Sequence, residues 1–127
     1  MSNAFSFSEQ AEVRIAEGPR DQPLLRTIED ASLVVEACSS GKTRSALLYA
    51  PNLTERFFDL SSGEAGAVLQ KLRNYGIRLA VVCTPGSVRF SSRFNEMVAE
   101  ESRGNHFRVF ESAETARGWL SGTPSGT

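Results

Sequence analysis

Two short apolar runs, each followed by a helical pattern, constrain the fold of this chain most. Ser45–Ala50 is closed by Pro51, and Ile77–Cys83 is followed by Thr84-Pro85-Gly86. A continuous apolar run of this length is typical of a central strand buried on both faces, because a half-exposed strand alternates apolar with polar side chains. Buried strands separated by helices predict an α/β fold with a mostly parallel sheet, since parallel neighbours need a crossover connection.

Apolar spacing and turn signals predict the other elements of this α/β fold. Alternation in Phe5–Ser8 and Glu12–Ile15 predicts an antiparallel hairpin at one edge of the sheet, and His106–Phe110 is predicted to be the last strand. The expected sheet is mixed, mostly parallel, and has four to five strands. About four helices are predicted, with apolar faces made by Ile28, Ala31, Val34, Val35 and Cys38, by Ala65, Val68, Leu69 and Leu72, by Phe90, Phe94, Met97 and Val98, and by Ala113, Ala116, Trp119 and Leu120.

The size of the chain fits one compact domain. At 127 residues it is large enough to bury a core without disulfides, so we expect a single domain over residues 1–120. Residues 121–127 form a Ser/Gly/Thr/Pro tail that is expected to be disordered. Cys38 and Cys83 lie far apart without metal-ligand spacing, so they indicate small buried side chains in a reducing compartment. No metal site or cofactor is expected.

The charge pattern argues against several classes of partner. The formal net charge is −1, and the fourteen basic and fifteen acidic side chains are spread along the chain. Nucleic-acid binding is not expected, because no basic block is present. No apolar run approaches the ~18 residues that a membrane helix needs, and Met1–Gln10 lacks the features of a signal peptide. The expectation is therefore a soluble cytoplasmic protein.

The segment before the second predicted helix is the first candidate site. A carboxylate, two hydroxyls and a glycine come directly before the start of that helix, namely Asp59, Ser61, Ser62 and Gly63. A helix start offers unpaired backbone N–H groups and the positive end of the macrodipole, which stabilise an anion or a phosphorylated hydroxyl. The alternative is purely structural, with Ser61 or Ser62 as an N-cap and Asp59 complementing the dipole.

The polar side of the second helix and its exit is the second candidate. A contact surface is expected there, formed by Gln70, Lys71, Asn74 and Arg78. The alternative is an ordinary solvated helix face, which needs the same residue types. His106 is the only histidine and lies far from the serines in sequence, so a Ser-His-Asp triad is not expected. The sequence therefore predicts no catalytic residues.

The order of elements resembles the STAS domain, named for sulfate transporters and anti-sigma-factor antagonists. In that family the second helix is preceded by Asp-Ser-Ser-Gly, with a phosphorylatable serine before the glycine. Phe58-Asp59-Leu60-Ser61-Ser62-Gly63 is similar, and Ser62 occupies the corresponding position. Leu60 departs from the pattern because it separates the acid from the hydroxyls.

A second resemblance covers most of the chain from Ala46 onward. The chain resembles the bacterial domain-of-unknown-function family 4180, which implies a STAS-like fold and a small bacterial protein but no established activity. Ser102 stands where that pattern has an asparagine. The residues that carry the resemblance are Phe57-Phe58-Asp59-Leu60, Ala65-Gly66, Gln70-Lys71, Asn74-Tyr75, Arg78-Leu79-Ala80 and Arg103-Gly104.

Three functional hypotheses follow. The first is a non-enzymatic regulatory or protein-interaction module that uses the Asp59-to-Gly63 loop and the second helix. The second is a small anionic ligand-binding protein or enzyme that uses the same strand-end rim, with Arg89 or Arg93 holding the anion. The third is a homodimer formed through the edge hairpin, where Phe5, Phe7 and Val13 would otherwise leave an unprotected strand edge.

Overall fold

The computed structural model describes residues 5–10, 12–19, 24–25, 28–53, 64–83, 96, 98–99 and 106–121 of the chain. The strands are β1 (Ser6–Gln10), β2 (Val13–Glu17), β3 (Ser45–Tyr49), β4 (Arg78–Val82) and β5 (Phe107–Phe110). The α-helices in these ranges are α1 (Ala31–Gly41), α3 (Glu64–Asn74) and α5 (Ala113–Ser121), and two short 3-10 turns are η1 (Ile28–Asp30) and η2 (Ala50–Asn52).

The sheet has the strand order β1-β2-β3-β4-β5. β1 pairs antiparallel with β2, and every other neighbouring pair is parallel. The predicted mixed sheet with an antiparallel edge hairpin is therefore confirmed, with five strands. Three α-helices lie within the described ranges, whereas about four were predicted. Of the third predicted helix, only Glu96, Val98 and Ala99 are described, and all three are helical.

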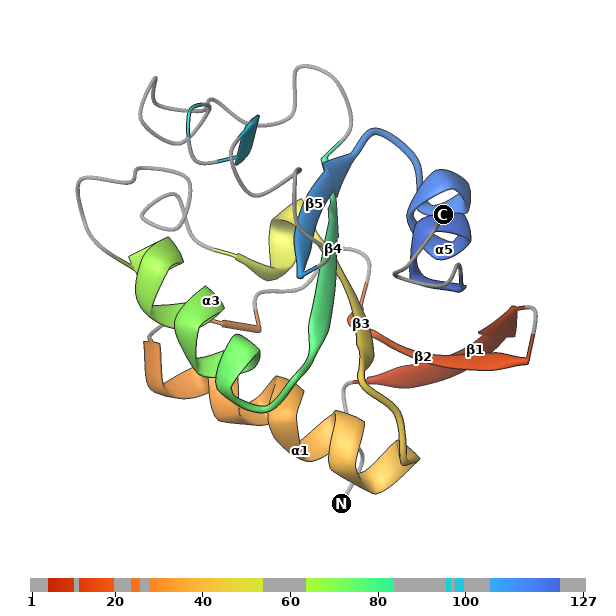
Figure 1. The fold of residues 1–127 in the computed structure, drawn as a ribbon, viewed down its shortest axis with the longest axis horizontal. Helices are drawn as coiled ribbons and strands as arrows, with labels where there is room; N and C mark the ends of the chain where they lie inside the picture. The colour runs from red at the N-terminus through yellow and green to blue at the C-terminus, as the bar shows by residue number, and fades with distance from the viewer. Residues whose placement is uncertain are drawn as a thin grey trace.

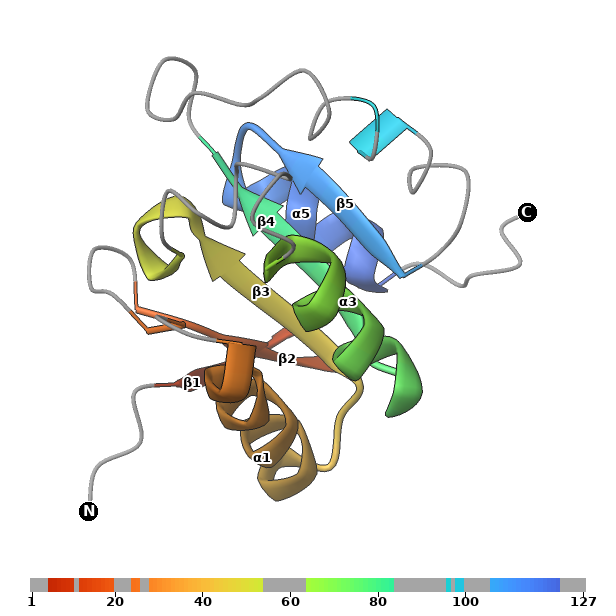
Figure 2. The same ribbon diagram turned by 90° about the vertical axis from the view of Figure 1, so that its left-hand side faces the viewer.

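The two faces of the sheet are covered by different helices. Ala46 and Leu48 of β3 pack in one apolar cluster with side chains of α1 and α3, while Leu47 and Tyr49 face the cluster that contains Ala116 of α5. Figure 2 shows α1 and α3 in front of the sheet and α5 behind it. The arrangement follows from the strand order, because right-handed crossovers that advance in one direction place their helices on the same face. The opposite face is left for α5, which follows the last strand (Figure 1).

The end of α1 differs from its prediction. The glycine-containing segment Ser40-Gly41 predicts the stop of this helix, but Gly41 is the last helical residue, and Lys42 adopts the left-handed conformation with φ 57°. The space around Gly41 gives the reason: a Cβ there would lie 2.3 Å from Cε1 of Phe7. Gly41 thus makes room for the ring of Phe7 from β1 rather than for a left-handed turn.

Other helix ends agree with the sequence. Gly76 has φ +70° after α3, as expected of a left-handed glycine. Ser112 directly precedes α5, where serine is a preferred N-cap, and its Oγ accepts a hydrogen bond of 3.3 Å from the backbone N–H of Thr115. The hairpin strands lie one or two residues later than predicted, because Gln10 pairs with Val13 and Glu12 turns the chain with φ 68°.

Replacing Gly41 by alanine should lower the free energy of unfolding by about 1–3 kcal/mol, because the new methyl group must displace the ring of Phe7. Gly66→Ala in α3 is the matched control, since a Cβ at Gly66 meets no described atom within 4 Å. That control should gain up to about 1 kcal/mol from helix propensity. Urea denaturation measures both variants, and equal shifts for the two would contradict a steric role for Gly41.

Candidate functional site

The loop singled out in the sequence lies outside the described residues. Asp59, Ser61, Ser62 and Gly63 all fall within residues 54–63, so their interactions with one another stay a prediction. The structure does describe both ends of this loop. It leaves the sheet at Leu53, just after η2, and returns at Glu64, the first residue of α3. Both ends of the loop therefore lie on the side of the sheet where the parallel strands have their C-terminal ends.

Asn52 fixes the chain at the start of this loop. Its side chain is fully buried: Oδ1 accepts a hydrogen bond of 2.7 Å from the backbone N–H of Tyr49, and Nδ2 donates one of 2.5 Å to the carbonyl of Pro19. Its own carbonyl accepts from the backbone N–H groups of Leu24 and Leu25 at 3.0 and 2.8 Å. One side chain and one carbonyl thus join the end of β3 to the segment that follows β2.

Gly18 makes room for Asn52. A Cβ at Gly18 would lie 2.6 Å from Asn52 Oδ1, and the backbone N–H of Gly18 donates to the carbonyl of Leu47 at 2.9 Å. Neither Gly18 nor Asn52 was among the candidate residues named from the sequence. Asn52 and Pro19 are 33 residues apart along the chain, so no local spacing could have revealed the bond between them.

Asn52→Ala should lower the free energy of unfolding by about 2–3 kcal/mol, since it leaves the N–H of Tyr49 and the carbonyl of Pro19 without this partner. Asn74→Ala is the control, because Asn74 is exposed on α3 and its loss should cost less than about 0.5 kcal/mol. Chemical denaturation gives both values. A neutral effect of Asn52→Ala would show that this side chain does not anchor the loop.

The exposed side of α3 brings two of the predicted site residues together. Gln70 Nε2 donates a hydrogen bond of 2.9 Å to Asn74 Oδ1, and both side chains are exposed. Gly66 lies one turn before Gln70 and is also exposed, so Gly66, Gln70 and Asn74 form a stripe with i, i+4 spacing. Lys71, also predicted for this surface, is half-buried beside the stripe. Tyr75, which follows the helix, is 57% exposed.

Arg78 lies on the other face of the sheet. Its Cζ atom is 4.2 Å from the ring centroid of Trp119, and its guanidinium donates to the carbonyls of Trp119 and Leu120 at 3.2 and 3.3 Å. The expectation that Arg78 extends the polar side of the second helix is therefore wrong. The reason is strand parity: Leu79 faces the layer of α1 and α3, so its neighbour must face α5.

Burial shifts the pKa of Arg78. Desolvation lowers the pKa of its guanidinium below the ordinary value, and the nearby charge of Arg108 lowers it further. The Arg108 Cζ atom lies 5.5 Å from the ring centroid of Trp119, whose ring also contacts Phe110 at a centroid distance of 5.7 Å. Two arginines and two aromatic rings thus attach the C-terminal half of α5 to β4 and β5.

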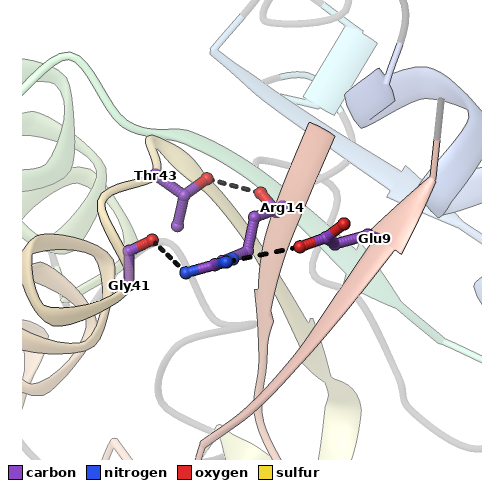
Figure 3. Close-up of polar contacts among 4 residues, drawn as sticks. All are labelled: Glu9, Arg14, Gly41 and Thr43. Carbon is purple, nitrogen blue, oxygen red and sulfur yellow. Dashed lines mark hydrogen bonds and ion pairs between the residues drawn. The ribbon is translucent and has the colours of Figure 1, made fainter. Parts of the chain in front are cut away.

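Arginines from the starts of strands also meet the ends of helices. Figure 3 shows Arg14 of β2 between Glu9 and the end of α1. Its Nη1 donates to the carbonyl of Gly41 at 3.1 Å, and its Nη2 lies 3.3 Å from Glu9 Oε2. Thr43 Oγ1 donates to the carbonyl of Arg14 at 2.5 Å. A cation is favourable here because the carbonyl end of a helix carries partial negative charge.

A buried carboxylate joins the hairpin to the last helix. Glu17 is 7% exposed and accepts hydrogen bonds from Arg117 Nε at 2.6 Å, Arg117 Nη2 at 3.0 Å and Ser8 Oγ at 2.5 Å. The hydrogen bond to Glu17 raises the pKa of Arg117 above its ordinary value, which outweighs the effect of burial. The two residues are 100 positions apart, so the sequence carried no signal for this pair.

Glu17→Gln should lower the free energy of unfolding by about 2–3 kcal/mol, because it removes the charge that compensates half-buried Arg117. Glu9→Gln breaks the exposed pair with Arg14 and should cost no more than about 1 kcal/mol. A double-mutant cycle with Arg117→Gln isolates the pairwise energy. A coupling no larger than that of Glu9 and Arg14 would refute the structural role of the buried pair.

Among the described residues, we considered the cysteines, the metal-binding side chains and the histidine as possible reactive groups. Burial raises the pKa of the Cys38 thiol to about 11 and that of Cys83 to about 12, so both stay protonated at neutral pH. No group of three metal-binding side chains occurs in the part of the chain that the structure describes. His106 opens β5 at the edge where the strands begin, whereas the serine loop joins the edge where they end.

The sequence model of one protein family matches residues 10–120. The chain belongs to the DUF4180 family, a domain of unknown function. The match confirms the resemblance to this family and spans all three α-helices described above except the last residue of α5. No curated protein and no solved structure matched the chain. None of the described helices of this DUF4180 domain has the length and apolar character needed to cross a bilayer.

Proposed function

We propose that this DUF4180 protein is a non-enzymatic regulatory module that binds a protein partner through the exposed stripe of α3 and the loop before it. Gly66 carries the proposal. Glycine inside a helix costs about 1 kcal/mol relative to alanine. Gly41 and Gly76 have structural reasons, a contact with Phe7 and a positive φ, but the described surroundings of Gly66 are open. Gly118 of α5 is also an exposed helical glycine, and Gly66 differs from it by lying on one stripe with Gln70 and Asn74. A bare stretch of helix backbone admits the close approach of another molecule.

Sequence adjacency links the stripe to the serine loop. Ser61, Ser62 and Gly63 immediately precede Glu64, so they lead directly into the helix turn that contains Gly66. Phosphorylation of Ser62 would add about two negative charges beside this surface and change the affinity of a partner. Gln70 and Asn74 supply amide groups further along the same stripe.

The resemblance to STAS domains supports a regulatory role of this kind. We propose a STAS-like fold and a bacterial, cytoplasmic protein, since those are what the two resemblances imply. The mixed sheet with its antiparallel edge hairpin agrees with such a fold at the level of architecture. Ser62 would then act as the phosphorylated residue, with Leu60 as a departure from the family pattern.

The anionic-ligand hypothesis at the strand-end rim receives less support. Within the described part of that rim, Arg117 is bound to Glu17, and Glu111 and Glu114 are exposed acids. The order of the five described strands never reverses, whereas ligands of open α/β sheets bind where it does. Arg89 and Arg93, named for this role from the sequence, lie outside the described residues.

Gly66→Arg tests the proposal by filling the open stripe. The tagged full chain is expressed in cells of the source organism, and co-purifying proteins are quantified by mass spectrometry. At least one partner should fall tenfold or more with Gly66→Arg and stay bound to Gly118→Arg, a matched control at an exposed helical glycine of α5. Ser62→Asp and Ser62→Ala should differ in the amount of that same partner.

Circular dichroism and denaturation curves of Gly66→Arg and Gly118→Arg show whether both variants are folded. Identical sets of co-purifying proteins for wild type and a folded Gly66→Arg would reject α3 as the interaction surface. Identical sets for the two Ser62 variants would remove the regulatory role of that serine.

A further inference from the structure

A shallow hollow opens at the edge of the sheet where the parallel strands begin. Its volume is about 550 Å³, and it is lined by Cys38 and Ser39 of α1 and by Lys42, Thr43 and Arg44 of the connection to β3. The serine loop follows the C-terminal end of β3, whereas the hollow lies beside its N-terminal end, so the two are on opposite sides of the sheet. The hollow plays no part in the proposed function.

The hollow carries two positive charges. Lys42 and Arg44 are exposed, and neither side chain forms a hydrogen bond or ion pair with another residue in the part of the chain that the structure describes. Arg14 and Arg117, in contrast, are paired with Glu9 and Glu17. Cys38 adds no negative charge, because burial raises the pKa of its thiol to about 11.

Paired carbonyl groups weaken the repulsion that an anion meets at the end of a helix. The carbonyls of Cys38 and Ser39 accept the backbone N–H groups of Thr43 and Lys42 at 2.9 and 3.2 Å. The carbonyl of Gly41 accepts from Arg14. The negative end of α1 is thus already compensated by the chain itself.

The backbone of Lys42 forms the left-handed turn that ends α1. Lys42 has φ 57° and ψ 45°, a left-handed conformation that favours glycine because a Cβ crowds the following carbonyl. A lysine in this position keeps an ammonium group at the rim of the hollow despite that strain.

We propose that this hollow binds a phosphoryl group, as inorganic phosphate or as the phosphate of a small metabolite, between the Lys42 ammonium and the Arg44 guanidinium. A guanidinium offers parallel N–H donors that match two phosphate oxygens, and an ammonium adds a compact charge. Both groups face solvent, so the affinity is expected in the millimolar range.

NMR titration of the ¹⁵N-labelled full chain tests the proposal, with inorganic phosphate, glycerol phosphate and sodium chloride at equal ionic strength. Phosphate should cause saturable shifts centred on the amides of residues 39–44, and chloride should not. Tighter binding of glycerol phosphate would assign the hollow to a phosphorylated metabolite, whereas equal binding would assign it to the phosphate ion. Shifts that do not saturate with either phosphate probe would overturn the proposal.

Lys42→Gly removes the positive charge of the side chain and preserves the left-handed backbone at this position. Glycine suits the left-handed backbone, so this variant should have a higher midpoint of urea denaturation and at least fivefold weaker phosphate binding. Arg44→Gln should weaken binding to a similar extent. Lys71→Gln on α3 is the control, since Lys71 lies outside the hollow and should leave the affinity unchanged. Phosphate affinity of Lys42→Gly equal to that of wild type would also overturn the proposal.

Discussion

The structure depends on a sheet whose strand order advances in one direction only. β2, β3, β4 and β5 are parallel neighbours in the order of the sequence, so the helices between them return antiparallel to the strands. α1 and α3, and likewise α5 after the last strand, therefore end at the side of the sheet where the strands begin. Carbonyl groups with partial negative charge therefore gather at that side, and side chains from the strand starts meet them. Arg14 and Arg78 bind helix carbonyls in this way.

Two buried polar side chains join separate parts of the fold by hydrogen bonds, in addition to the apolar packing. Asn52 joins the end of β3 to the segment after β2, and Glu17 joins the hairpin to α5. Both satisfy several hydrogen-bonding groups at once, which is the condition under which burial of polar groups is tolerated. Each connects segments far apart in sequence, so each ties a peripheral element to the central strands.

The sequence predicted the architecture well because hydrophobic spacing reports burial directly. All five residues of β3 are buried, as its apolar run implied, and Val68, Leu69 and Leu72 of α3 face the core as predicted. The prediction failed where a distant side chain decides a local feature. The ring of Phe7 explains why position 41 is a glycine, and strand parity turns Arg78 toward Trp119 rather than toward α3.

The candidate site was predicted only in part for the same reason. Gln70 and Asn74 share a helix face because their spacing is local, and the structure brings them together. Asn52, Glu17 and the hollow at Lys42 depend on contacts between separate elements, which residue patterns along a single segment do not encode. The left-handed backbone of Lys42 gave no signal either, since the neighbouring glycine is the residue that normally takes that conformation.

The placement of α5 has a consequence for synthesis on the ribosome. Among the described elements, this last helix is the one that packs on the face formed by Leu47, Tyr49 and Ala80. Translation delivers the five described strands before α5, so α5 cannot cover this apolar surface in the nascent chain until residues 113–121 have left the exit tunnel. A chaperone that shields hydrophobic surface would find its target there, during that interval.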